Sequence, residues 1–116
     1  MKKRYRIKKN SEIDAIFKNK VVKGDSYFAI YQRVDEVSEN FRFALSIGRR
    51  YGGAVERNLA KRRIRMIVQE VKNDINPKIN FVIVVKPSAI ELTYQDMKTK
   101  LLALIKKSKL MEKEHE

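Results

Sequence analysis

The sequence predicts an α/β fold in which a small mixed sheet packs with helices as an α-β sandwich. Residues 41–48, FRFALSIG, alternate between large apolar side chains and polar or small ones, as a half-buried strand does. From Ala54 onward, apolar residues instead recur at the 3.6-residue period of a helix. Residues 79–85, INFVIVV, are apolar at nearly every position, which is typical of a central strand covered on both faces.

The first third of the chain predicts an arm, a short helix and a strand. Residues 1–9 include six basic residues and are expected to form a basic arm. Ser11 precedes Asp14 by three residues, as in a capping box, so a helix is expected over residues 11–19. The aromatic and branched residues of 27–32 predict a strand.

Two further helices are predicted, each from one apolar stripe. The stripe of the first is formed by Ala60, Ile64, Ile67 and Val71, and Asn76-Pro77 ends this helix. The second begins at a capping-box pair, Thr93 and Asp96, and its stripe is formed by Met97, Leu101, Leu104 and Ile105. Residues 1–116 are expected to form one domain with a frayed polar tail at 110–116, and the patterning leaves the strand order open.

Composition restricts the function. The 116 residues include no Cys, which excludes thiol catalysis, Cys-based zinc sites and disulfides. The formal net charge is +13, yet 43% of residues are hydrophobic, so a folded domain tolerates strong self-repulsion. The usual compensation is an anionic partner, nucleic acid first and an anionic membrane surface second. No apolar run approaches the ~20 residues of a membrane span, and no secretory signal is evident, so a cytoplasmic location without membrane attachment is expected.

The segment RNLAKRRIR, residues 57–65, is the most informative one. At 100° per residue, five of its six polar side chains fall within an arc of about 140° beside the Ala60 stripe; they are Arg57, Asn58, Lys61, Arg62 and Arg65. Like charges four residues apart destabilise a helix by roughly 0.2–0.5 kcal/mol per pair, and the nearest acid, Glu56, lies outside the arc. A merely solvated face usually mixes Glu with Lys, so a polyanion-binding surface is the favoured interpretation.

The two early strands predict a second feature. Alternation places Tyr27, Ala29 and Tyr31 on one face of the first strand, and Arg42, Ala44 and Ser46 on one face of the second. If the faces coincide, small residues leave a groove, and tyrosine rings can stack on unpaired bases, with Phe17 lining the same edge. The alternative is that the tyrosines simply cover the core.

Catalytic groups are not evident. The single His, His115, lies in the tail, and no carboxylate pair, Walker loop, GxGxxG or metal-ligand cluster is present. A protein-borne active site is therefore not expected, and neither a catalytic nor a metal-binding residue is assigned.

Residues 46–65, SIGRRYGGAVERNLAKRRIR, resemble the signature of the bacterial ribonuclease P protein family. The matching residues are Arg49, Arg50, Gly52, Ala54, Val55, Arg57, Asn58, Lys61, Arg62 and Arg65. Similarity continues at residues 6–10, 41–48 and 86–94, and so covers nearly the whole chain. Two positions depart from the family: Ile13 stands where an aromatic is common, and Gly53 replaces a common Asn.

The resemblance implies both fold and activity. The expected fold is like that of ribosomal protein S5 domain 2. The chain would be the protein subunit of a ribonucleoprotein endoribonuclease that removes the 5′ leader from precursor tRNA. Its partners would be a catalytic RNA subunit and precursor tRNA, with no obligate protein partner. The RNA would hold the Mg²⁺ cofactor and perform the chemistry.

The resemblance also implies roles for particular residues. RNA binding would fall to Arg49, Arg50, Arg57, Asn58, Lys61, Arg62 and Arg65. A cleft for the single-stranded leader would be lined by Phe17, Phe28, Tyr31 and Arg42.

Three alternatives are weaker. A general RNA-binding module shares the charge but does not explain the groove. A DNA-binding domain would need paired helices flanking a turn, which are not evident. A protein-only nuclease would need clustered carboxylates for metals.

Overall fold

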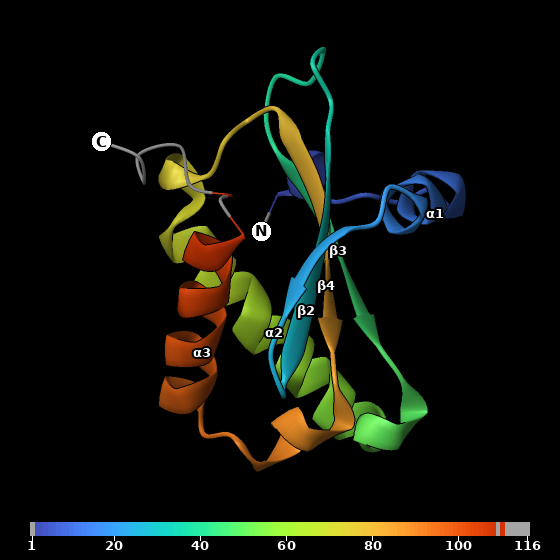
Figure 1. Ribbon diagram of the computed structural model, residues 1–116. Coiled ribbons are helices and arrows are strands. Elements are labelled where there is room, and N and C mark those ends of the chain that lie inside the picture. The colour runs from blue at the N-terminus through green and yellow to red at the C-terminus, as the bar shows by residue number, and fades with distance from the viewer. Residues whose placement is uncertain (1, 109, 111–116) are drawn as a thin grey trace.

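The computed structural model of the chain describes residues 2–108 and Leu110 (Figure 1). Its helices are α1 (Asn10–Lys18), α2 (Ala54–Glu70) and α3 (Tyr94–Lys107). Its strands are β1 (Val21–Gly24), β2 (Phe28–Val34), β3 (Arg42–Ile47) and β4 (Ile79–Val85). Short 3₁₀ turns are η1 (Lys3–Tyr5), η2 (Arg49–Tyr51), η3 (Lys72–Asp74) and η4 (Pro87–Glu91).

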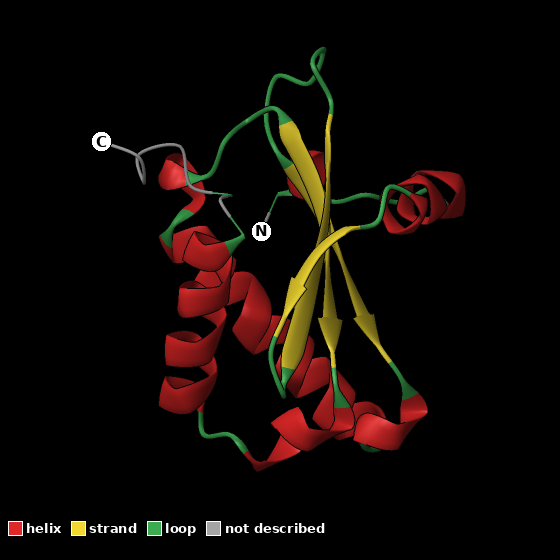
Figure 2. Cartoon of the chain, in the orientation of Figure 1, coloured by secondary structure: helices red, strands yellow, loops and turns green. Residues whose placement is uncertain are grey.

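The four strands form one mixed sheet in the order β1-β2-β4-β3. Strand β2 is antiparallel to both β1 and β4, whereas β3 and β4 are parallel. Helices α2 and α3 lie on one side of the sheet and α1 on the other (Figures 1 and 2). The predicted α/β class with a small mixed sheet is confirmed.

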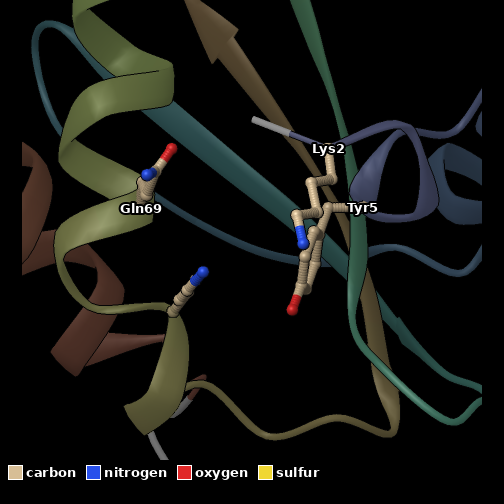
Figure 3. A pocket seen from close by; sticks show the side chains of 4 residues that line it. Lys2, Tyr5 and Gln69 are labelled. Atoms are coloured by element: carbon tan, nitrogen blue, oxygen red, sulfur yellow. The ribbon is translucent and has the colours of Figure 1, made fainter.

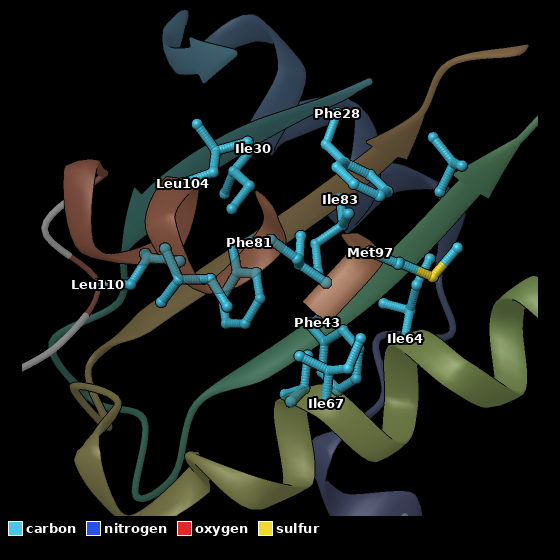
Figure 4. Close-up of a cluster of buried hydrophobic side chains, with 14 of the residues drawn as sticks. Phe28, Ile30, Phe43, Ile64, Ile67, Phe81, Ile83, Met97, Leu104 and Leu110 are labelled. Atoms are coloured by element: carbon cyan, nitrogen blue, oxygen red, sulfur yellow. The ribbon is translucent and has the colours of Figure 1, made fainter. Parts of the chain in front are cut away.

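The main hydrophobic core fills the space between the sheet and the α2–α3 layer (Figure 4). The sheet contributes Phe28, Ile30, Phe43, Phe81 and Ile83, and the helices contribute residues that include Ile64, Ile67, Met97, Leu101 and Ile105. A smaller core on the opposite face consists of Ile7, Ile16 and Val82. Strand β4 is buried from both sides, as the apolar run at 79–85 predicts.

Several boundaries agree with the sequence. Strand β4 covers the predicted residues 79–85, and the Oγ1 of Thr93 caps α3 by accepting a hydrogen bond from the N–H of Asp96 at 3.1 Å. The stripe of α3 is buried as predicted.

Other expectations are wrong. Strand β1 was not predicted, because its four residues are exposed and too few to show alternation. Helix α1 begins at Asn10 after Lys9, without the side-chain cap expected from Ser11. Helix α2 ends at Glu70, before Asn76-Pro77, because the chain turns through η3.

The predicted basic arm packs against β3, which lies at one edge of the sheet. Tyr5 belongs to the main core, whereas Ile7 belongs to the smaller core, so the arm crosses the sheet edge between them. The Ile7 N–H donates to the carbonyl of Phe43 at 3.0 Å. Burying a side chain such as that of Ile7 stabilises by roughly 1.5–3 kcal/mol, which helps to hold the arm in place.

The prediction of a frayed tail from residue 110 is wrong at its first position, because Leu110 is fully buried in the main core. Residues 111–116, including His115, lie outside the described residues. In the part of the chain that is described, no helix combines the length and apolarity needed to cross a membrane.

Candidate nucleic-acid interface

The polar residues predicted on α2 form one surface, which we call the basic ridge: Arg57, Asn58, Lys61, Arg62 and Arg65. The ridge faces outward because Ala60, Ile64 and Ile67 are buried against the sheet. Asn58 and Arg62 are exposed, and the other three are half-buried. The helix therefore presents guanidinium and ammonium groups to solvent from one side, as the wheel geometry predicts.

No acidic side chain of the described residues neutralises the basic ridge. Within these residues, the two ion pairs are Arg42 with Glu12 and Lys98 with Glu70, and neither involves the ridge. Arg57 uses its Nη1 to donate to the carbonyl of Gly52 at 2.7 Å. The four cations of the ridge thus stand close together, and an anionic ligand would relieve their mutual repulsion.

Arg65 is a half-buried cation of the ridge and lies beside Arg6. Burial first, and the positive charge of Arg6 second, lower the pKa of the Arg65 guanidinium. An arginine stays protonated in proteins, so the lowered pKa indicates that the positive charge of Arg65 is poorly stabilised at this place. A bound phosphate would stabilise it.

A hollow of about 480 Å³ lies along the ridge, and we call it the ridge hollow. It is lined by Arg6, Asn58, Lys61, Arg62, Arg65, Met66 and Gln69. Sequence reasoning did not single out Arg6, Met66 or Gln69. The only available signal was that Arg6 belongs to the basic arm, and the packing of that arm on β3 brings its side chain beside Arg65.

The second feature is the face of the sheet on which α1 lies. We call it the open face, because α1 covers only part of it. Register aligns Tyr31 with Val82 and Val82 with Ala44, so the predicted faces of β2 and β3 coincide. The rings of Phe17 and Tyr31 meet edge to face, with centroids 4.8 Å apart. Beyond the part that α1 covers, Ser46 is exposed.

The basic ridge and the open face adjoin each other. A hollow across the outer edge of β3, the edge hollow, is lined by Arg6, Ile7, Ile13, Phe43, Ala44, Leu45, Lys61 and Arg65. Lys61 and Arg65 belong to the ridge, whereas Ile13 and Ala44 pack with Tyr31 in the smaller cluster. The basic ridge therefore continues into the open face through this hollow.

Comparison with known proteins decides the family. The sequence profile of the family Ribonuclease P matches residues 1–109. This chain belongs to the ribonuclease P protein family. It is accordingly a protein component of ribonuclease P, a ribonuclease complex of tRNA processing.

Relatives in this family are similar over nearly the whole chain. The "Ribonuclease P protein component" of Acholeplasma laidlawii is 47% identical over 98% of this chain and 97% of its own. That of Bacillus cereus strain G9842 is 38% identical over 93% of this chain and 94% of its own.

Solved structures of ribonuclease P proteins share the fold. The Staphylococcus aureus protein superposes with a TM-score of 0.88 at 27% identity, covering 92% of this chain and 97% of that one. The Thermotoga maritima protein gives a TM-score of 0.79 at 24% identity, covering 88% and 96%, and this likeness concerns the fold alone.

The structure separates the residues that the family resemblance assigned to a leader cleft. Phe17 and Tyr31 lie together on the open face. The prediction that Phe28 lies there is wrong, because Phe28 points to the other face and is fully buried in the main core. Tyr27, which precedes β2, also packs against the main core rather than beside Tyr31.

The other assigned residues flank the two surfaces. Arg42 lies on the α1 side, where it forms an ion pair with Glu12 and is therefore not a free cation. Arg49 and Arg50 are exposed on η2, between β3 and the start of α2. Ile13 is half-buried in the smaller cluster, and Gly53 precedes α2, where its N–H donates to Oε1 of Glu56 at 2.8 Å.

The described ranges contain no group of three or more His, Cys, Asp or Glu side chains placed to hold a metal ion. Because these residues do not fit a metal site, we assign them no step through Mg²⁺. What they do offer is hydrogen-bond donors, positive charge and aromatic surface, which are the means of binding an RNA chain.

Proposed function

We propose that this chain binds the catalytic RNA subunit of ribonuclease P through the basic ridge, and holds the single-stranded 5′ leader of precursor tRNA over the open face. The RNA subunit would then carry the chemistry of endonucleolytic leader removal, with Mg²⁺ held mainly by the RNA. The product is the mature 5′ end of the tRNA, and the cytoplasm is the expected place of action.

The proposal rests on one observation: the basic ridge adjoins the open face, and residues of both surfaces line the edge hollow. The residues of the basic ridge take part in neither ion pair of the described residues. Arginine forks match phosphate oxygens bidentately, so the ridge suits a folded RNA backbone. Aromatic rings stack on unpaired bases of any sequence, so the open face suits a single strand. The two surfaces together suit a protein that positions a leader beside a catalytic RNA.

The test is cleavage of precursor tRNA at low Mg²⁺ by the cognate catalytic RNA, with and without this protein. We expect cleavage to depend on the protein, because additional substrate contacts and added positive charge lower the requirement for Mg²⁺. If the protein binds RNA tightly yet leaves cleavage unchanged, the proposal fails, and a general RNA-binding role replaces it.

A further inference from the structure

A further hollow lies beyond the ridge hollow, beside the C-terminal end of α2. We call it the arm hollow, and it is lined by Lys2, Tyr5, Gln69 and Lys72. Figure 3 shows Lys2 and Tyr5 on one side and Gln69 of α2 on the other. None of the matched signature residues lines it.

Positive charge gathers around the ring of Tyr5. The guanidinium carbon of Arg4 lies 5.1 Å and Nζ of Lys72 lies 6.0 Å from the ring centroid. Arg4 also donates to the Tyr5 hydroxyl through Nη2 at 3.3 Å. Lys2 lines the same hollow. Within the described residues, none of these cations has an ion-pair partner.

The arm hollow and the ridge hollow adjoin each other along α2, because Gln69 lines both, and we call the two hollows together the trough. From Asn58 to Gln69 the helix rises about 16 Å at 1.5 Å per residue. The trough therefore extends well past Arg65, where the signature of the family ends.

The arm that carries one side of the arm hollow is held in place before any ligand arrives. Tyr5 is nearly buried, and its ring lies 4.8 Å from that of Phe41. The backbone of Arg4 accepts a hydrogen bond from Nδ2 of Asn40 at 2.9 Å. Because the arm is fixed at these points, ordering it upon binding costs less conformational entropy.

We propose that the arm hollow is a phosphate-binding site for the catalytic RNA, which continues the basic ridge along the whole of α2. The proposal rests on the proposed function, because it takes the ridge to face that RNA. Lysine is a point-charge ligand of phosphate, and the Tyr5 hydroxyl and Gln69 amide add hydrogen-bond donors. None of the lining residues is a carboxylate that would repel a phosphate.

The test measures binding of the full-length protein to the cognate catalytic RNA over a range of salt concentrations. In the double variant Lys2→Ala/Lys72→Ala, we expect weaker binding and a log–log salt slope shallower by about two units, because each lysine would neutralise one phosphate. The matched control is Lys23→Ala/Lys100→Ala. It removes the same charge from the region of β1 and α3, at the other end of the sheet from β3.

A second variant distinguishes a specific phosphate-binding site from non-specific electrostatic attraction of the RNA. Tyr5→Phe keeps the ring packed on Phe41 and removes one hydroxyl. We expect it to weaken RNA binding several-fold while leaving the salt slope unchanged, because the net charge is unchanged. Circular dichroism of each variant confirms that the fold is retained.

Arg65→Ala in the same assay distinguishes the two proposals. If Arg65→Ala weakens binding but the Lys2/Lys72 variant behaves like its control, the arm hollow is not a phosphate site. If Arg65→Ala also has no effect, the proposed function itself fails. If the Lys2/Lys72 variant impairs only the uptake of precursor tRNA by the assembled complex, the occupant is the substrate and the proposal is overturned.

Discussion

At the residue scale, Arg65 combines the features of a phosphate ligand: it is half-buried, lacks an acidic partner among the described residues, and lies close to Arg6. We predict that Arg65→Ala lowers affinity for the catalytic RNA and makes the log–log salt slope shallower by about one unit. Fold stability should barely change, since the Arg65 side chain makes no hydrogen bond within the described residues that would hold the core. Salt-dependent RNA binding and urea unfolding check this; unfolding with unchanged affinity per folded molecule would contradict it.

Arg57 differs from Arg65 because its guanidinium also holds the carbonyl of Gly52. We predict that Arg57→Ala likewise makes the salt slope shallower by about one unit. In addition, it should lower the free energy of unfolding by about 1 kcal/mol, because the variant cannot form the hydrogen bond at the start of α2. The same two measurements check both effects, and the ridge assignment is wrong if only the stability changes.

Tyr31 offers a test of the open face, because its ring meets Phe17 edge to face where α1 covers the sheet. We predict that Tyr31→Ala weakens binding of precursor tRNA with a long leader more than binding of one with a one-nucleotide leader. The matched control is Tyr27→Ala, since Tyr27 packs against the main core. Substrate affinity of the assembled complex is the measurement, and equal losses for both leaders would remove Tyr31 from leader binding.

The alternation of residues along the strands predicts correctly, at some positions and not at others, which face of the sheet a side chain occupies. Strand alternation puts Phe28 with Ile30 and opposite Tyr31, and the structure agrees. The family resemblance alone placed Phe28 in a cleft, and the packing of the larger helical layer decides against it. Tyr27 does not follow the alternation, because it lies before β2, which begins at Phe28. It belongs to a turn in which Asp25 accepts hydrogen bonds from two backbone N–H groups.

At the element scale, a single substitution can test whether Thr93 stabilises α3 as its N-cap. We predict that Thr93→Ala lowers the free energy of unfolding by about 1 kcal/mol, because the N–H of Asp96 loses its partner. Thr99→Ala in the same helix is the control, because Thr99 is exposed and alanine has the higher helix propensity. Denaturant unfolding measures both; equal changes would show that Thr93 does not act as a cap.

Helices α2 and α3 are joined on their outer sides by Glu70 and Lys98, with 2.8 Å between Oε1 and Nζ. The hydrogen bond from Lys98 lowers the pKa of the Glu70 carboxyl below its ordinary value of 4.5. A lowered pKa gives stability that is present above pH 4.5 and is lost as the pH falls through the lowered pKa. Acidification should therefore abolish the contribution of this pair.

We predict that Glu70→Gln destabilises the protein at neutral pH, and that its difference from wild type shrinks as the pH falls below 4.5. Urea unfolding at several pH values is the measurement. Glu91→Gln is the control, since Glu91 is exposed and belongs to neither of the two ion pairs of the described residues. A difference that stays constant over the whole pH range would contradict the assignment.

Elements with strong patterns were predictable, and elements formed by tertiary contacts were not. The run at 79–85 must be a buried strand because it is apolar on both faces. Strand β1 carries no such signal, since Val21 and Val22 stay 46% and 41% exposed. It exists because its backbone pairs with β2, which no local pattern reveals.

At the scale of the whole molecule, the candidate interface depends on the strand order, which the sequence left open. With β3 at the edge of the sheet, the arm can pair with it and bring Arg6 beside α2. The same edge lets the open face meet the basic ridge at the edge hollow. The net charge of +13 predicted an anionic partner. Only the assembled fold shows that the positive charge of the arm and of α2 lines one trough.

Because positive charge is concentrated in the trough, we expect the free energy of unfolding to depend on which anion is present. An anion that binds only the native protein adds about 1.4 kcal/mol of stability at ten times its Kd. We predict that sodium sulfate raises the Tm, followed by circular dichroism, more than sodium chloride does at equal ionic strength. Sulfate also stabilises proteins through exclusion from their surface, so a variant is needed to separate the two effects. Arg65→Ala/Lys72→Ala should keep the exclusion effect and lose the additional gain; an unchanged gain would show that the trough does not bind the anion.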